Sequence, residues 1–369
     1  MSWIKTETGK NISVLVFSAL ISLLFLELFL RFYNPFGFRI KGDKILLYPH
    51  KKYVIENSSL KGTDKKIIHS KNSLGLRGEE PPKDFSSRLS VIAVGGSTTE
   101  GFYLSDGKTW PEILQNKLKK DFPNIWINNA GIDGQSSYGH IIFTREYLSK
   151  LKPKIAIFYC GLNDIGLSAM NSYDSFSKES KIKKAAKFLS KNIEIVSCAF
   201  NLYLYFSYKK TGITHGNIDF ANIEKIKVSD QEKKEILNSE KQNAKNYSLR
   251  LKELIRETRK NGIEPVFIAQ TSLCKKAFDL NTKINLGEIA VKNKFLNCEI
   301  FGEILNIYNR EMEKTAKEEK VFFIDADKIM PSNSSYYYDL FHFNNSGAEV
   351  FADKIKTPFI KFLKNKYNN

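Results

Sequence analysis

The sequence predicts an α/β fold, a three-layer α/β/α sandwich with a five-stranded parallel sheet, preceded by one N-terminal transmembrane helix. Two observations support this prediction. From residue 89 onward, short apolar runs alternate with longer amphipathic segments, which is typical of a parallel sheet covered by helices on both faces. Residues 11–30 form an almost uninterrupted apolar run of about the 20 residues that a bilayer-spanning helix needs.

The apolar run at 11–30 follows a short leader, residues 1–10, and we expect it to remain as a single-pass anchor. A cleaved signal peptide is the alternative, but its apolar region is shorter and small residues follow it, whereas residues 27–31 here read ELFLR. Glu27 precedes Arg31 by four residues, so these two side chains can pair near the membrane interface. More basic residues follow the run than precede it, which favours a cytoplasmic domain, yet a long domain behind an N-terminal anchor is usually exported. We therefore expect a periplasmic or other extracytoplasmic domain.

The elements of the expected domain follow from this alternation. Residues 31–88 lack a sustained period and are expected to be a membrane-proximal segment that packs on the domain formed by 89–369. Strands are expected at 89–94, 125–129, 154–159, 263–269 and 320–324, and helices at 108–120, 137–150, 231–261, 299–319 and 344–364. The connection at about 166–230 is long enough to be an inserted segment. Its aromatic stretch, 200–208, is expected to form a lid, a membrane-touching element or a buried helix, and the sequence leaves these three open.

Charge and cysteine content narrow the ligand classes. The chain has 57 Lys and Arg against 40 Asp and Glu, a formal charge of +17, which favours anionic partners such as phospholipid headgroups or acidic glycans. It contains no recognisable nucleic-acid-binding motif, so we expect no nucleic-acid partner. The four cysteines have no CxxC spacing, and we expect no metal site and no cofactor. Cys274 and Cys298 either pair, if the domain is exported, or remain two buried thiols.

Three polar patches follow expected strands. VIAVGGSTT at 91–99 leads a buried-type strand into two glycines and Ser97. NNAGIDGQS at 128–136 places Gly134 after the next strand, and YCGLND at 159–164 places Asn163 after the third. In open parallel sheets ligands bind at the carboxyl ends of strands, where backbone N–H groups point outward. Each patch alone is an ordinary turn, but together they supply a hydroxyl, a glycine N–H and a carboxamide, as an oxyanion hole requires.

A fourth patch, DLFHFN at 339–344, precedes the last expected helix. Asp339 and His342 are three residues apart, so the carboxylate can hold the imidazole in one tautomer and stabilise its positive charge. The other histidines have no acidic partner at this spacing. We therefore expect His342 to be a general base for Ser97.

These four patches, in the order GGST, NxAGxxG, GxND and DxxH, resemble the SGNH hydrolase superfamily, also called GDSL-type esterases, over roughly residues 89–365. The resemblance implies the parallel-sheet sandwich, Ser97 as nucleophile, and the N–H of Ser97, Gly134 and Asn163 as oxyanion-hole donors. It also implies His342 as general base and Asp339 as its orienting acid. The usual Gly-Asp-Ser is here Gly95-Gly96-Ser97, as in anchored bacterial relatives, which affects the subfamily and leaves the triad intact.

The expected function is that of a serine esterase acting through an acyl-serine intermediate, with an O-acetyl or short acyl group on a cell-surface glycan preferred over a lipid ester as substrate. An O-acyltransferase with a sugar hydroxyl as acceptor is an alternative with the same triad. An anchored, catalytically silent scaffold that binds a glycan or lipid is a third. Arg77, in the turn-rich patch NSLGLRG at 72–78, is expected either to bind a carboxylate or phosphate of the substrate or to lie solvated on a surface turn. The sequence predicts neither a protein partner nor an oligomeric state.

Overall fold

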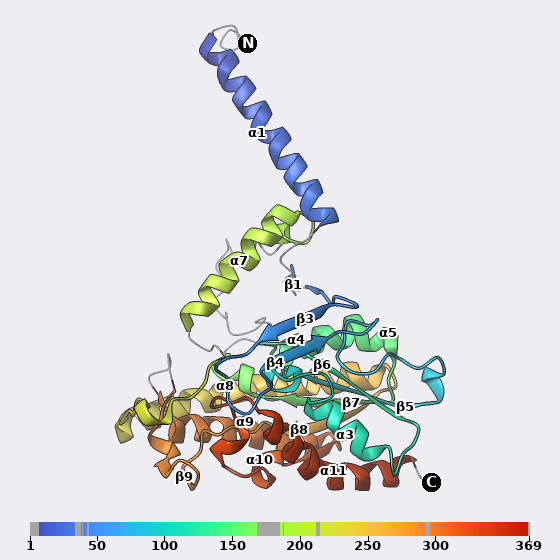
Figure 1. The fold of residues 1–369 in the computed structure, drawn as a ribbon, viewed down its shortest axis with the longest axis vertical. Helices are drawn as coiled ribbons and strands as arrows, with labels where there is room; N and C mark the ends of the chain where they lie inside the picture. Colours follow the sequence, from blue (N-terminus) through green and yellow to red (C-terminus); the bar gives the residue numbers. More distant parts are fainter. Residues whose placement is uncertain are drawn as a thin grey trace. The chain divides into compact units, whose positions relative to one another are not determined.

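The computed structural model describes residues 7–33, 38, 40–42, 44–167, 185–186, 188–211, 215–291 and 296–367. The chain divides into two compact units. One comprises 1–46 and 179–211, and the other comprises 47–178 and 212–369. Figure 1 draws the elements of both units, with colours that follow the sequence from blue at the N-terminus to red at the C-terminus.

The larger unit is built on a five-stranded parallel sheet. Its strands are β5 (Leu89–Gly95), β6 (Ile125–Gly131), β7 (Ile155–Cys160), β8 (Glu264–Ala269) and β13 (Phe322–Ile324). Their order across the sheet is β13-β8-β7-β5-β6, and every neighbouring pair is parallel. The three central strands β5, β7 and β8 consist almost entirely of buried residues, as expected when both faces are covered. The predicted sheet is confirmed, with strand ends shifted by at most two residues.

Helices cover the sheet in two groups, which makes the three-layer sandwich (Figure 1). Helix α3 (Trp110–Leu118) packs on α11 (Asn345–Tyr367), whereas α8 (Asp230–Lys260) packs on both α4 (Ser137–Phe143) and α9 (Cys298–Glu318). α3 and α8 each begin with a capping box, Thr109 with Glu112 and Ser229 with Glu232. The helix expected at 137–150 is not regular, because α4 passes into a π-helical turn at Thr144–Leu148 before the short α5 (Ser149–Leu151).

Several short hairpins were not predicted from the sequence. The longest pairs β3 (Lys52–Glu56) with β4 (Lys66–Ser70), and β9 (Phe278–Asp279) pairs with β10 (Ile284–Asn285). Two further pairs are β1 (Ile40–Lys41) with β2 (Lys44–Ile45) and β11 (Ala290–Val291) with β12 (Leu296–Asn297). The β3–β4 connection, residues 57–65, is too long for a two-residue turn and therefore has no such turn signal in the sequence. Asn57 orders it by accepting bonds from the N–H groups of Ser59 and Leu60.

The smaller unit contains two long helices, α1 (Glu7–Phe32) and α7 (Glu194–Thr211). α1 has a mean hydropathy of 2.5 over its best window and is the one helix among the described residues that is long and apolar enough to cross a membrane. The expected pairing of Glu27 with Arg31 is present at 3.2 Å. Residues 168–184, 187 and 212–214 of the inserted segment lie outside the described residues, as do the side chains of 204–211, so the three alternatives for the aromatic stretch stay open.

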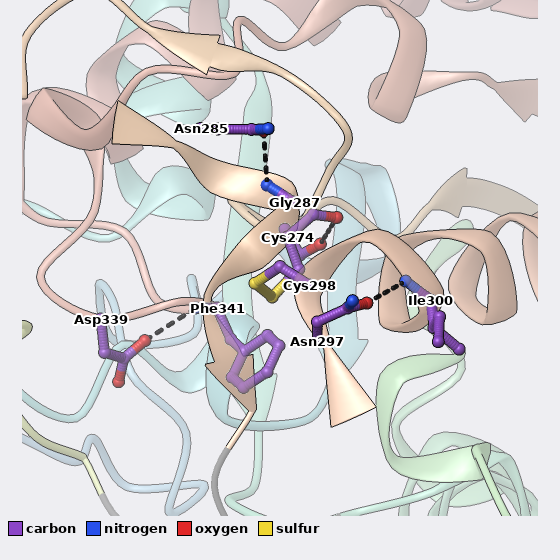
Figure 2. The surroundings of a disulfide bond; sticks show 9 residues. Cys274, Asn285, Gly287, Asn297, Cys298, Ile300, Asp339 and Phe341 are labelled. Atoms are coloured by element: carbon purple, nitrogen blue, oxygen red, sulfur yellow. Dashed lines mark hydrogen bonds between the residues drawn. A yellow bond between two sulfur atoms is a disulfide. The ribbon is translucent and has the colours of Figure 1, made fainter. Parts of the chain in front are cut away.

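A disulfide joins Cys274 to Cys298, with 4.4 Å between their Cα atoms, so the first of the two alternatives for these cysteines holds (Figure 2). Cys298 begins α9, and Cys274 lies in the chain that follows β8. Leu273, next to Cys274, donates its N–H to the carbonyl of Leu340 at 2.9 Å. The disulfide is therefore next to a residue, Leu273, that is hydrogen-bonded to the segment that carries Asp339 and His342.

Candidate active site

Ser97 stands where β5 ends and the one-turn helix α2 (Ser97–Glu100) begins, and its side chain is largely buried. The two preceding glycines are required by close approach. A Cβ on Gly95 would lie 2.1 Å from Thr99 Oγ1, and one on Gly96 would lie 2.4 Å from the side-chain nitrogen of Asn163. As the first residue of α2, Ser97 has a backbone N–H without an intrahelical acceptor. The GGST sequence thus brings a serine hydroxyl, its own N–H and the Asn163 amide to one point.

The structure brings His342 and Asp339 to Ser97. His342 Nε2 lies 2.7 Å from Ser97 Oγ, and His342 Nδ1 lies 2.7 Å from Asp339 Oδ2. Because a carboxylate only accepts, the Nδ1 atom carries the proton and Nε2 is left to accept the bond from the serine hydroxyl. This is the arrangement that a serine nucleophile and its general base need.

Asp339 is held as an ion. Its Oδ1 accepts the backbone N–H of Phe341 at 2.8 Å and that of His342 at 2.7 Å. Burial opposes ionisation, but the imidazole of His342, together with these backbone donors, holds the pKa of Asp339 below its usual value. The carboxylate therefore stays charged where it faces His342. Tyr338 adds orientation, because its ring is stacked on that of His342 at an interplanar angle of 8°.

Gly134 and Asn163 lie in the turns that follow β6 and β7, the two strands that flank β5 in the sheet. Gly134 has φ +72°, a left-handed conformation that favours glycine. The preceding residue, Asp133, holds the turn in place by donating its N–H to the buried carboxylate of Glu100 at 2.8 Å. Asn163 donates one side-chain hydrogen to the carbonyl of Gln135 at 3.1 Å, which leaves the other hydrogen of the same amide for a substrate. The two sequence-predicted donors thus belong to one hydrogen-bonded turn system.

A buried ion pair that sequence reasoning missed ties these two turns together. Asp164, the last residue of GLND, accepts from Arg250 Nη2 at 3.0 Å, and both side chains are fully buried. The same carboxylate accepts the backbone N–H and the hydroxyl of Ser137, and Arg250 Nε donates to that hydroxyl at 2.8 Å. Burial raises the pKa of Asp164, although Arg250 and Ser137 oppose the shift. Arg250 is in the middle of α8, where an exposed Arg is the ordinary expectation, so no local signal identified it.

His215 is a second residue that sequence reasoning missed. Its ring centroid lies 4.2 Å from that of His342, its Nδ1 is 2.7 Å from the Tyr338 hydroxyl, and its Nε2 is 3.4 Å from Asp133 Oδ2. Burial opposes a charge on His215, but Asp133 raises its pKa above the ordinary value. No local pattern predicts this contact, because Asp133 is 82 positions away along the chain.

Among the described residues, His215, Asp339 and His342 form the one group that offers metal-ligand atoms close together, within 4.8 Å of one another. Each ring nitrogen of His342 already faces Asp339 or Ser97, and those of His215 face Tyr338 and Asp133. A metal ion would have to displace these bonds, so the group is better matched to proton transfer than to metal binding.

The prediction that Arg77 binds the substrate is wrong, and so is the alternative of a solvated Arg on a surface turn. Its side chain is fully buried and donates to the carbonyls of Glu100, Gly101 and Leu104. Its backbone also exchanges two hydrogen bonds with Asn129 of β6. The guanidinium therefore anchors the chain that follows α2.

A cavity of about 10 Å³ opens beside Ser97 and His342, lined also by Thr98, Trp110 and Tyr338. The space that these residues enclose therefore holds about one water molecule.

The family model of the GDSL-like lipase/acylhydrolase family matches residues 93–350, which include Ser97, Gly134, Asn163, Asp339 and His342. A comparison with curated protein sequences gives no match.

Solved structures with a similar fold include the acetylxylan esterase Axe2 from Geobacillus stearothermophilus, at 13% identity and a TM-score of 0.41, covering 73% of this chain and 93% of that one. A GDSL-like lipase from Bacteroides thetaiotaomicron has 14% identity and a TM-score of 0.38, covering 77% and 93%. The α/β hydrolase LAE5 from the metagenome of Lake Arreo has 12% identity and a TM-score of 0.41, covering 73% and 94%.

Proposed function

The chain belongs to the GDSL-like lipase/acylhydrolase family, the ester-hydrolysing SGNH superfamily, and we propose that Ser97, His342 and Asp339 form its catalytic triad. The observation that carries this proposal is the continuous chain of hydrogen bonds from Asp339 through His342 to Ser97, with both links at 2.7 Å. A catalytically silent scaffold has no need for such an alignment of three buried polar side chains.

In the proposed reaction, His342 Nε2 takes the hydroxyl proton as Ser97 Oγ attacks the ester carbonyl. Asp339 stabilises the resulting imidazolium without taking a proton itself. The oxyanion accepts from the N–H groups of Ser97 and Gly134 and from the second hydrogen of the Asn163 amide. His342 then gives its proton to the leaving alcohol, and water, activated by the same imidazole, releases the acid from the acyl-serine.

The proposed substrate is an O-acetyl or other short acyl ester on a cell-surface glycan. The net charge of +17 supports an anionic polymer, because a basic protein raises the local concentration of such a substrate. A lipid ester is the competing substrate class.

We place the catalytic domain outside the cytoplasm, held by α1 as a retained single-pass anchor. α1 is long and apolar enough to span a bilayer. The Cys274–Cys298 disulfide supports export, since such bonds persist in oxidising compartments and are rare in the cytosol.

The experiment is hydrolysis of p-nitrophenyl acetate, butyrate and octanoate by the wild type, Ser97→Ala and His342→Ala, with the exposed Ser87→Ala as the matched control. The proposal predicts a preference for acetate, loss of turnover in the first two variants and full turnover in the control. Equal turnover in wild type and Ser97→Ala would refute the triad.

An O-acyltransferase would use the same residues, and the burial of Ser97 and His342 is compatible with excluding water from the acyl-enzyme. Release of acetate from an O-acetylated polysaccharide, measured with and without a soluble oligosaccharide acceptor, separates the two reactions. Hydrolysis predicts acetate release that the acceptor does not reduce, whereas transfer predicts acetylated acceptor at the expense of free acetate.

A further inference from the structure

The half-buried side chain of Glu27, near the C-terminal end of α1, caps the start of α7. The carboxylate of Glu27 accepts the backbone N–H of Glu194 at 2.9 Å and that of Ile195 at 3.0 Å. These are N–H groups of the first turn of α7, which have no acceptor within their own helix. A negative charge at this position also matches the positive end of the α7 dipole.

Further bonds within the smaller unit hold the same two regions together. Arg31 donates to the carbonyl of Asn192 at 3.0 Å while it pairs with Glu27. Lys41 pairs with Glu194, and Asn201 of α7 donates to the carbonyl of Ile40 at 2.9 Å. The chain at 192–201 is therefore attached to the segment 27–41 at several points that are independent of one another.

These bonds set the depth of the attached chain in a membrane. At a rise of about 1.5 Å per residue, the apolar residues 11–30 span roughly the 30 Å of a hydrocarbon core, which puts Glu27 and Arg31 near its edge. Residues bonded to them must lie at nearly the same depth. Phe32 and Tyr33, directly beyond, are exposed aromatics of the kind enriched at a membrane interface.

Large apolar side chains are exposed on the attached chain as well. Phe188 is 66% exposed, Leu189 45% and Ile193 37%, all within a few residues of the bonds to Glu27 and Arg31. In water such a cluster of apolar side chains is unfavourable, whereas at the depth of an aromatic belt the same side chains are stabilised by leaving water.

We propose that residues 188–193 and the start of α7 form a second membrane contact, seated in the interfacial layer of the bilayer next to α1. This inference rests on the proposal that α1 is retained as an anchor. The occupant of the apolar face is lipid, because the bonds to Glu27 and Arg31 place the face beside the hydrocarbon edge. A peptide chain thus leaves the membrane at Tyr33 and returns to it some 155 residues later.

The test uses the full chain in vesicles of phosphatidylcholine and phosphatidylglycerol, in a Cys198→Ser background. An environment-sensitive fluorophore is attached at Leu189→Cys, at Val16→Cys within α1, and at Phe278→Cys, an exposed apolar position of β9 in the other unit. We expect doxyl-labelled lipid to quench the label at 189 at least about threefold more than the label at 278, and iodide in water to show the reverse order.

A label at 189 that iodide quenches as strongly as the label at 278, while lipid still quenches the label at 16, would overturn the second contact and leave the anchor standing. Loss of lipid quenching at 16 would overturn the anchor and the contact together. Hydrolysis of p-nitrophenyl acetate by the same vesicles reports the proposed esterase separately.

Glu27→Ala provides a second arm, with Glu7→Ala at the other end of α1 as the matched control. Removal of the Glu27 carboxylate takes away the cap at the start of α7 and the ion-pair partner of Arg31, while the bonds of Lys41 and Asn201 remain. Lipid quenching at 189 should therefore fall by about twofold or more without a change in quenching at 16. Unchanged quenching at 189 in Glu27→Ala would contradict the depth argument.

Discussion

Breaking the buried pair of Asp164 and Arg250 should lower both stability and turnover. Both side chains are fully buried, so Asp164→Asn removes a carboxylate that pairs with the Arg250 guanidinium in the interior. Removing one partner of such a pair typically lowers the free energy of unfolding by about 3–5 kcal/mol. At about 2–4 °C per kcal/mol for large domains, Tm should fall by roughly 6–20 °C.

Turnover should fall as well, because Asp164 also fixes Ser137 and adjoins Asn163. Loosening the turns that carry Gly134 and Asn163 weakens the oxyanion hole, and loss of one donor of this kind lowers kcat by about 100- to 1,000-fold. A partial displacement should therefore lower kcat by roughly 10- to 100-fold. The assay is thermal unfolding by circular dichroism together with kcat for p-nitrophenyl acetate, below the Tm of the variant.

Two further variants make the reasoning refutable. Asp84→Asn breaks the exposed pair with Arg88 and should leave Tm and kcat unchanged, because such pairs are screened by water. Replacing both buried partners, Asp164→Leu with Arg250→Met, should recover part of the lost Tm but not the lost kcat, because the N–H and hydroxyl of Ser137 still lose their acceptor. An unchanged Tm in Asp164→Asn, or a double variant with full kcat, would show that the pair does not position the turns.

Three other changes have defined outcomes. Gly96→Ala places a Cβ 2.4 Å from the Asn163 amide nitrogen and should lower kcat by roughly 10- to 100-fold with little change in Tm. A normal kcat in steady-state kinetics would contradict this. Burial, together with the charges of Arg77 and Lys71, lowers the pKa of His69 to about 2, so only the unfolded chain takes up a proton below pH 6.5. His69 should therefore lower the free energy of unfolding by about 1.4 kcal/mol per pH unit as the pH falls from 6.5 toward 2, and urea unfolding of His69→Leu should have a pH slope shallower by this amount. Reduction of the Cys274–Cys298 disulfide, which spans 24 positions, should lower the free energy of unfolding by about 3 kcal/mol, measured by urea unfolding with and without reductant.

The sheet was predictable because each strand is a short apolar run bounded by polar residues, as at 89–95 and 155–160. In a parallel sheet the carboxyl ends of strands share one edge, so the order of the motifs was enough to expect Ser97, Gly134 and Asn163 near one another. The contact between Asp339 and His342 was also predictable, because side chains three residues apart can face one another across a turn.

The residues that sequence reasoning missed or misjudged depend on contacts between distant segments. Arg77 and Arg250 look like surface arginines, because nothing in the local sequence reveals that backbone carbonyls or a buried carboxylate will surround them. His215 meets Asp133 and His342 only in the folded domain, because the three residues are far apart in the sequence. The short hairpins were missed for a related reason, as two- to five-residue strands carry too few residues to establish a period.

Covalent labelling would decide whether Ser97 is a nucleophile activated by His342. The full chain is treated with diisopropyl fluorophosphate, and the adduct is located by mass spectrometry of peptides in the wild type, Ser97→Ala, His342→Ala and the control Ser87→Ala. The proposed triad predicts one adduct, on Ser97, in the wild type and control, none in Ser97→Ala, and labelling slowed by at least about 1,000-fold in His342→Ala. An adduct on a different serine, or equal labelling rates with and without His342, would contradict the assignment.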